Sequence, residues 1–506
     1  MKDIFVARNL FLPLLLLGVL IRLPSLCHPI DEGHRNAQTA TLTAGMIENG
    51  RLRLDPIAPW RGDLDARLVL ELPIYNLCVL ALAKIPGLSL DGAGRSVSLI
   101  FWALGFWLLQ KLWQLALPKD AHFWANLLFV LAPMSWYLST AFMPETLVQL
   151  LSITFILLVI RHSCQPSSAN AVALVLVAGL GLLIKLPAFA HLGVFLLLVL
   201  VDRGGWHALL NPILIMGGLI IVASLLAWSQ FIESVNTTYF PSWTGRENLI
   251  GFVQPHISRL SASFWTPLVG YNLAFILPVL VAPFAAVGFW KFWHARNNFL
   301  HSRTWLYLLA SLLTSWLIWA KGPAAQSYYN LPNLIVFSAA FGMGVCQAEG
   351  LRVRISLLGR AVLVAILVVS SFAGYLYLSR PDYVTVEVAQ WIRTNTGCDD
   401  IILYQPRHAA AVMDYEHQPL LSHLTAKRTW IWTRSTPEWE RVRSLKTSNY
   451  LIVTNPQPTI SPIEALRISF KGPPPPPPSS ISLSNPKEFL KMHGNERFVV
   501  YAFIKK

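Results

Sequence analysis

Long apolar runs separated by short polar segments dominate the sequence. Several of these runs reach the ~20 residues that an α-helix needs to cross a bilayer. We interpret eleven of them as spans, at residues 9–26, 96–117, 121–139, 146–160, 170–185, 187–201, 209–228, 270–290, 304–320, 331–347 and 361–379. The pattern predicts an α-helical polytopic membrane protein with about eleven transmembrane helices.

One further apolar run, 68–86, decides the topology, because each span reverses the side of every later loop. This run also holds Glu71 and Pro73. If it does not span, nearly all short basic loops, such as those with Lys111 and Arg203, face the cytoplasm, as the positive-inside bias requires. We therefore expect 68–86 to be a re-entrant or interfacial helix. The chain is then a multi-pass protein of the inner (plasma) membrane, with its N-terminus cytoplasmic and its C-terminus extracytoplasmic.

The last part of the chain differs in character from the rest. Apolar positions at helical spacing over 384–396 are followed by short strand-like runs at 400–404, 449–455 and 498–504. The six prolines 473–478 favour a polyproline II spacer of roughly 19 Å, at ~3.1 Å per residue. We predict a transmembrane domain over 1–379, including an outer loop 27–95, and a small extracytoplasmic soluble α/β domain over 380–506.

The composition agrees with a membrane protein and excludes several other classes. Apolar and aromatic residues make up 54% of the chain, charged residues 13%, and the mean hydropathy is +0.50, whereas soluble domains carry about 25% charged residues. The net charge of +14 is explained by cytoplasmic loops, so it implies no nucleic-acid partner. The five cysteines show no spacing typical of a metal or redox site.

The outer loop 27–95 contains the candidate chemistry. Asp31 and Glu32 lie at the outer end of the first span, where adjacent carboxylates are costly unless they are paired. They either cap the helix that follows or take part in a reaction. The loop also carries arginines, whose planar guanidinium suits phosphate binding. These are Arg35, Arg51, Arg53, Arg61 and Arg67.

Several short motifs follow one another in a characteristic order. They are Glu71-Leu72-Pro73-Ile74-Tyr75, Gly94-Arg95-Ser96-Val97-Ser98, Met143-Pro144-Glu145, the segment Gly181 to Pro187 with Lys185, and Tyr328-Tyr329-Asn330-Leu331-Pro332. With the acidic pair that closes the first span, they resemble the GT-C polytopic glycosyltransferases over about residues 10–350. The protein O-mannosyltransferases and the bacterial aminoarabinose transferases are the most similar members.

The resemblance implies a membrane glycosyltransferase. It implies transfer of a sugar from a polyprenyl-phosphate donor to a lipid, glycan or protein acceptor on the outer face of the membrane, with inversion. Asp31 would be the general base that takes the proton of the acceptor hydroxyl, and Glu32 would orient the acceptor. Arg35 lies one helical turn from Asp31, so it can face the same cleft.

Four more residues are candidates for binding the donor or acceptor, each with a structural alternative. Glu145 is either a site residue or a helix N-terminal acid. Lys185 either contacts the donor phosphate or snorkels to the membrane surface. Tyr328 and Tyr329 contact the sugar or lipid phosphate or anchor the interface. Glu71, next to Pro73, is expected to shape the interfacial helix rather than to react.

No metal ligands are assigned from the sequence. His28 and His34 could hold a divalent metal with Asp31, but their spacing is not diagnostic, so a divalent metal stays an alternative and no cofactor is assigned. Asn236-Thr237-Thr238 matches the N-glycosylation pattern, which often occurs by chance.

The competing interpretation is a polytopic transporter, or a flippase or ligase of lipid-linked glycans. Transporters tend to carry charged residues inside their spans and paired broken helices in two repeated halves. The sequence indicates neither feature, which favours an enzyme.

Overall fold

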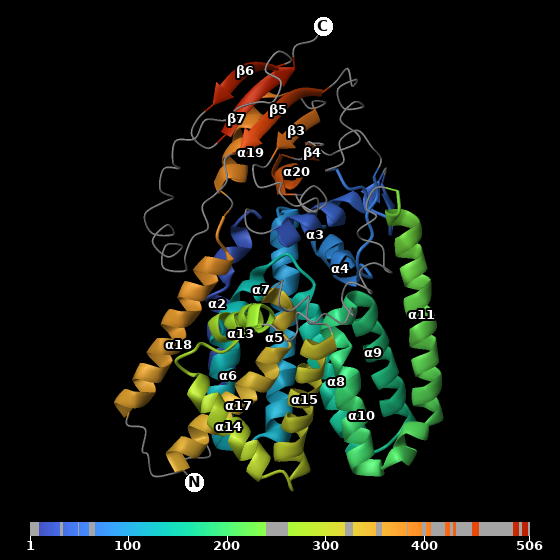
Figure 1. Cartoon of the computed structure of the whole chain (residues 1–506), viewed down its shortest axis with the longest axis vertical. Coiled ribbons are helices and arrows are strands. Elements are labelled where there is room, and N and C mark those ends of the chain that lie inside the picture. Colours follow the sequence, from blue (N-terminus) through green and yellow to red (C-terminus); the bar gives the residue numbers. More distant parts are fainter. Residues whose placement is uncertain are drawn as a thin grey trace.

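The computed structural model describes most of the chain. The described residues are 10–30, 34–48, 50–59, 66–238, 262–318, 327–350, 357–381, 383–396, 401–405, 420–425, 429–431, 448–454, 489–494 and 498–503. A bundle of long helices occupies one end of the molecule and a β-sheet the other (Figure 1).

The helices of the bundle account for the apolar runs. They are α2 (Phe11–Leu20), α5 (Leu90–Ala116), α6 (Lys119–Leu131), α7 (Pro133–Thr140), α8 (Glu145–Cys164), α9 (Ser168–Phe189), α10 (His191–Gly204), α11 (Pro212–Asn236), α13 (Ala262–Tyr271), α14 (Ala282–His294), α15 (Thr304–Ile318), α17 (Asn333–Gly350) and α18 (Leu357–Leu378). Within the described residues, five helices are long and apolar enough to cross a membrane: α5, α8, α9, α11 and most of α18. Shorter apolar helices lie at Phe11–Cys27 and Asn333–Ala348.

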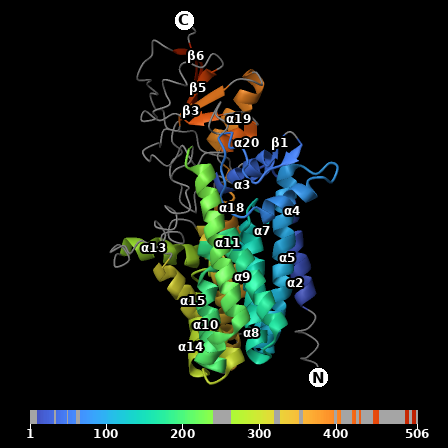
Figure 2. The same ribbon diagram turned by 90° about the vertical axis from the view of Figure 1, so that its right-hand side faces the viewer.

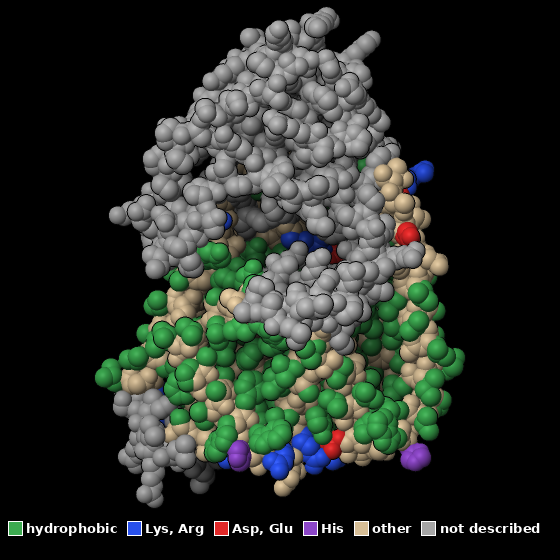
Figure 3. Space-filling model, viewed as in Figure 1, with side chains coloured by type: hydrophobic (Ala, Val, Ile, Leu, Met, Phe, Trp, Pro, Cys, Tyr) green, Lys and Arg blue, Asp and Glu red, His purple; other side chains and the backbone are tan. Residues whose placement is uncertain are grey.

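The surface of the bundle is that of a membrane protein. Hydrophobic side chains cover its flank, and Lys and Arg side chains gather at the end away from the sheet (Figure 3). Exposed apolar residues on α11, such as Leu219 and Ile220 at 60% exposure each, would face lipid rather than water. The chain is an integral membrane protein.

Two predicted spans are interrupted in the structure. The run 121–139 is divided into α6 and α7, because Ala132 leaves the helical region just before Pro133 (φ −58°, ψ 132°), as residues before proline tend to do. The run 270–290 contains the end of α13, a π-helical turn η5 (Asn272–Ile276) and α14. Hydropathy alone did not indicate either break, since both segments stay apolar.

The run 68–86 contains only a short helix, α4 (Ile74–Leu82). Its nine residues are about 14 Å long at 1.5 Å per residue, well below the ~30 Å of a hydrocarbon core. It lies with α3 (His34–Gly45) at the end of the bundle that faces the sheet (Figures 1 and 2). The run thus holds no helix long enough to span, in agreement with the prediction, which the orientation of the loops still has to test.

The sheet is built from the C-terminal part of the chain. Its five strands have the order β4 (Thr429–Ile431), β3 (Ile401–Gln405), β5 (Ser448–Thr454), β7 (Phe498–Phe503) and β6 (Phe489–Gly494). β3 is parallel to both of its neighbours, whereas β7 is antiparallel to both of its own. Helices α19 (Tyr383–Asn395) and α20 (Leu420–Thr425) accompany it. The proline run 473–478 lies outside the described residues, and the division into two domains at 379/380 stays a prediction.

Candidate active site at the outer end of the bundle

A buried ion pair forms the centre of the candidate site. The Lys185 ammonium donates a hydrogen bond to Oε1 of Glu145, and each residue is 4% exposed. Glu145 is the first residue of α8, and Lys185 belongs to α9. Lys185 does not snorkel to the membrane surface, so that alternative is wrong. Glu145 is both a helix N-terminal acid and a partner in the site.

The geometry of α9 explains why Lys185 enters the bundle. The backbone of Lys185 is non-helical (φ −156°, ψ 79°), and Pro187 lies two residues further on. Because proline has no N–H, it cannot bond the carbonyl four residues earlier. That carbonyl, on Leu183, instead accepts from the backbone N–H of Leu72 at 3.1 Å. The Lys185 kink therefore also fixes the chain next to Glu71.

Tyr328 and Tyr329 lie over the same ammonium. The Lys185 Nζ atom is 4.7 Å and 5.0 Å from their ring centres, within the range of a cation–π contact. Both belong to the short helix η7 (Ser327–Asn330). Burial, and then the neighbouring Tyr329, raise the pKa of the Tyr328 phenol well above its usual value, so the phenol is neutral at physiological pH.

A small pocket opens beside these side chains. Its lining combines charged, aromatic and apolar side chains. The lining residues are Glu145, Val148, Lys185, Ala188, Tyr328, Leu331 and Pro332. Among the described residues, Oε2 of Glu145 is buried without a hydrogen-bond partner, so the site retains an acceptor for a donor group of a ligand.

Arg35 forms a second ion pair at the edge of the site. Its guanidinium donates to Glu71 Oε1 and, at 2.6 Å, to Gln38 Oε1. Burial opposes the charge, but the nearby Glu71 carboxylate, with smaller contributions such as that of Glu145, outweighs it, so the pKa of Arg35 is raised above its usual value. Glu71 is the partner of Arg35, a structural contact, and the expectation that it does not react stays a prediction.

The segment Gly94 to Ser98 holds the neighbouring loops in place. Arg95 donates to the carbonyl of Thr140 at 2.7 Å and to that of Pro29 at 3.1 Å. Ser98 Oγ donates to the carbonyl of Ala141 at 2.6 Å. A Cβ on Gly94 would lie 2.1 Å from the Phe142 ring, so only glycine allows this close approach. The motif thus positions the turn before Glu145 and the stem of the outer loop.

A buried network of asparagine amides, which no sequence motif predicted, fixes the short helix η7. Asn272, in the π-helical turn, donates to Asn330 Oδ1 at 3.1 Å, and Asn333 donates to Asn272 Oδ1 at 2.8 Å and to Asn330 Oδ1 at 3.1 Å. π-Helical turns inside helices often occur at functional sites. Three asparagines spread over sixty residues carry no local signal, apart from Asn330, which follows the tyrosines.

Asp31 and Glu32 lie outside the described residues, between Ile30 and the start of α3. Their roles stay predictions. The residues on either side are placed: the Pro29 carbonyl is bound by Arg95 and α3 carries Arg35.

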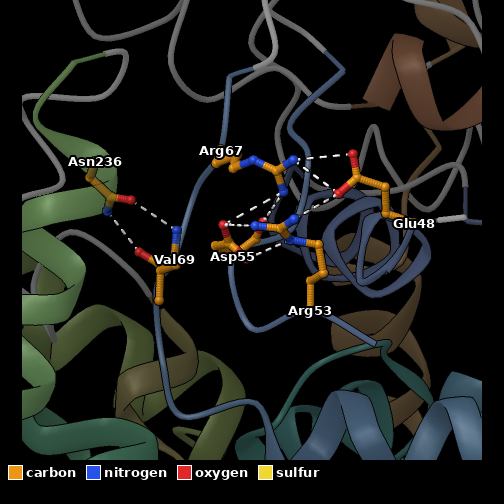
Figure 4. Close-up of polar contacts among 6 residues, drawn as sticks. All are labelled: Glu48, Arg53, Asp55, Arg67, Val69 and Asn236. Carbon is orange, nitrogen blue, oxygen red and sulfur yellow. Dashed lines mark hydrogen bonds and ion pairs between the residues drawn. The ribbon is translucent and has the colours of Figure 1, made fainter. Parts of the chain in front are cut away.

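Two of the other four loop arginines, Arg53 and Arg67, are paired with acids. Arg53 bonds Asp55 at 3.0 Å and 2.9 Å, and Arg67 bonds Glu48 at 3.1 Å and 2.9 Å (Figure 4). Arg53 lowers the pKa of the Asp55 carboxyl below its usual value, chiefly through these hydrogen bonds. Arg53 and Arg67 thus already have acidic partners, and a phosphate-binding role for them stays a prediction. Arg51 is exposed on β2 (Arg51–Leu52), and Arg61 lies outside the described residues.

Asn236 connects the outer loop to α11. Its amide donates to the Val69 carbonyl at 2.7 Å and accepts from the Val69 N–H at 2.9 Å (Figure 4). It is 0% exposed. The N-glycosylation match is therefore a structural contact and not a modification site.

No group of three His, Cys, Asp or Glu side chains that could hold a metal lies within the described part of the chain. His28 is exposed, and Asp31, Glu32 and the side chain of His34 are not among the described groups. A divalent metal therefore stays an alternative. Arg22, Glu145 and Lys185 are buried among the helices, each at or near the outer end of its predicted span. The expectation that no charged residue lies well inside a span stays a prediction.

Comparisons with known proteins agree on the fold. No protein-family model matches the sequence, and no curated protein matches it. The structure is similar to that of ArnT, an aminoarabinose transferase, from Cupriavidus metallidurans in the apo state, with a TM-score of 0.63 and 15% identity over 98% of both chains. It is also similar to the oligosaccharyltransferase of Archaeoglobus fulgidus, with a TM-score of 0.52 and 12% identity over 88% of this chain and 69% of that one. The chain thus has the GT-C-type fold that its motifs predict.

Proposed function

We propose that the protein is a membrane glycosyltransferase that moves a sugar from a polyprenyl-phosphate donor to an acceptor on the outer face of the membrane. The observation that carries the proposal is the buried Lys185–Glu145 pair beneath Tyr328 and Tyr329, beside a pocket lined by charged, aromatic and apolar side chains. The fold it shares with ArnT and with an archaeal oligosaccharyltransferase supports the same reaction class.

The cations beside the pocket suit a phosphate group. Lys185 is a compact cation with three N–H donors, and Arg35 has five, more than Gln38 and Glu71 occupy. Further along α8, a second, apolar pocket is lined by Ser152, Ile156, His191, Leu192, Leu308, Leu312, Pro332, Ile335 and Val336. The two pockets share Pro332, and α8 lines both. A phosphate next to Lys185 would thus have its prenyl chain on the apolar side.

The proposed reaction is a single displacement at the anomeric carbon of the sugar. The acceptor hydroxyl oxygen forms a bond to the anomeric carbon, the bond from that carbon to the phosphate oxygen breaks, and its electron pair leaves with polyprenyl phosphate. The hydroxyl proton passes to the Asp31 carboxylate as general base, and Glu32 orients the acceptor. Attack from the face opposite the phosphate inverts the anomeric centre. The phosphate gains negative charge as the bond breaks, and Arg35 stabilises that charge.

In the proposed topology, the protein crosses the inner membrane about eleven times. The N-terminus and the basic loops lie in the cytoplasm, whereas the outer loop 27–95 and residues 380–506 lie outside. The C-terminal sheet is then on the acceptor side. The acceptor is a lipid, a glycan or a protein.

The proposal is tested with the purified chain in detergent, without any gradient. A panel of polyprenyl-phosphate-linked pentoses and hexoses is offered with cell-envelope lipid, polysaccharide and peptide acceptors. We expect release of polyprenyl phosphate and appearance of the sugar on one acceptor. A transporter or flippase would leave every donor intact in detergent and would move it across the membrane of proteoliposomes; that result would exclude the proposed function.

A further inference from the structure

The start of α5 connects the C-terminal part of the chain to the stem of the outer loop. Asp91 is the second residue of this helix. Its Oδ2 accepts from the backbone N–H of Ile30 at 3.0 Å, and its Oδ1 lies 3.1 Å from Nε2 of His423 on α20. One carboxylate therefore bridges two segments that are almost four hundred residues apart in sequence.

The stem of the loop is held at two successive residues by one face of α5. Arg95 lies one turn after Asp91 and binds the Pro29 carbonyl at 3.1 Å, while Asp91 binds the N–H of Ile30. Ile30 is 0% exposed. Pro29 and Ile30 directly precede Asp31 in the sequence, so the two contacts fix the described end of the stem.

The position of α20 couples it to the stem of the loop. It packs on α3 and α19 (Figure 2), and its Leu420, Leu421 and Leu424 belong to the same buried cluster as Ile30. Arg393 of α19 donates to the Leu424 carbonyl. His423 is 13% exposed and Asp91 20% exposed, so their contact is shielded from water and stronger than a surface pair.

We propose that Asp91 is a positioning residue for the acidic pair Asp31–Glu32, and that His423 makes this position depend on the seating of α20. The proposal rests on the proposed function, because it takes Asp31 as the reacting group. Loss of the His423 contact, or a displacement of α20, would then change the stem of the loop through Asp91.

The first test does not require activity. Hydrogen–deuterium exchange of the peptide over residues 27–33 is compared between the wild-type chain and the His423→Ala, Asp91→Asn and Asp91→Ala variants. The Ile30 amide loses its acceptor in Asp91→Ala, and we expect its exchange to rise about tenfold or more. His423→Ala should raise the exchange of the same peptide, by a smaller factor. Unchanged exchange in His423→Ala would overturn the proposal.

The second test separates positioning from general stability. We expect Asp91→Ala to lower kcat about tenfold with the donor KM unchanged, and His423→Ala to lower it less. The effects of the two variants should not add in the double variant, because they share one contact. Asp120→Ala is the matched control, since Asp120 is likewise the second residue of a helix, α6, but exposed.

These outcomes distinguish the inference from the proposed function. If the wild-type chain transfers no sugar, the proposed function fails, while the exchange result still decides whether His423 and Asp91 control the stem. If the wild-type chain is active and both variants keep its kcat, or lose only thermal stability, the positioning role is wrong.

Discussion

Lys185 and Glu145, forty residues apart, form an ion pair inside the bundle, with each residue 4% exposed. A lysine near the end of an apolar run would normally extend its ammonium to the membrane surface. Here the kink before Pro187 directs it inward. Two charges removed from water are tolerated only when they are paired. Each residue therefore needs the other to keep its buried charge.

We expect Lys185→Met to destabilise the protein strongly. Removing one partner leaves the buried carboxylate alone, which costs about 3–5 kcal/mol. The double variant Lys185→Met/Glu145→Gln carries no buried charge and should recover most of the loss. Thermal unfolding in detergent measures both. The protein that remains folded should show a raised donor KM, because the cation that captures the lipid phosphate is gone.

Lys111→Met is the control for this pair. Lys111 is exposed, with its ammonium 5.9 Å from the Trp107 ring centre, so its loss should change neither the unfolding temperature nor the donor KM. If Lys185→Met were as stable as the wild-type protein and bound donor equally well, the pair would have no role in the site.

Asp31→Asn should leave folding intact and reduce transfer. The amide has the same size as the carboxylate but cannot accept the hydroxyl proton, and a general base typically contributes 10²–10⁴-fold to the rate. Steady-state turnover of the donor by the purified variant is the measurement. Glu32→Gln, which removes the neighbouring charge, should have a smaller effect. Wild-type turnover in Asp31→Asn would exclude it as the base.

Arg35→Ala should lower kcat more than it raises the donor KM. The reason is that the phosphate gains charge as the glycosidic bond breaks, so a cation at the site acts most strongly on the transition state. Arg53→Ala is the comparison, because Arg53 belongs to the same outer loop but is paired with Asp55 and Glu48. Equal kinetics in the two variants would return Arg35 to a structural role with Glu71.

Asn272→Leu should weaken donor binding through Tyr328 and Tyr329. It removes the amide that joins the π-helical turn to Asn330 and Asn333, and unpaired buried amides cost about 1–3 kcal/mol. We expect a raised donor KM together with a lower unfolding temperature. Asn126→Leu is matched, because Asn126 is also a buried amide, bonded to Trp113 and Gln110. It should lower the unfolding temperature and leave the donor KM unchanged.

The topology predicts which loops react with a membrane-impermeant thiol reagent on intact cells. In a cysteine-free background, a cysteine that replaces exposed Arg51 should be labelled, and one that replaces Lys111 should be labelled only after the cells are opened. Labelling of position 111 from outside would reverse the topology, and the proposed acceptor side with it.

Several features of this protein were readable from local sequence. Membrane insertion follows from apolar runs long enough to span, because the hydrophobic effect acts on each segment separately. The short α4 follows from Glu71, Pro73 and the charge balance of the loops. The order of the motifs predicted the GT-C-type fold, which the structure shares with ArnT. The residues Arg35, Glu145, Lys185, Tyr328 and Tyr329 were also identified as candidates in this way.

The partners of those residues were decided only by the tertiary structure. Arg35 could have bound phosphate or an acid, and the structure pairs it with Glu71. Lys185 could have faced lipid headgroups, and it faces Glu145. The three-asparagine network was equally invisible. The physical reason is common to all: a charge or an amide in a membrane bundle takes whichever partner packing brings within about 3 Å, and here that partner lies tens of residues away.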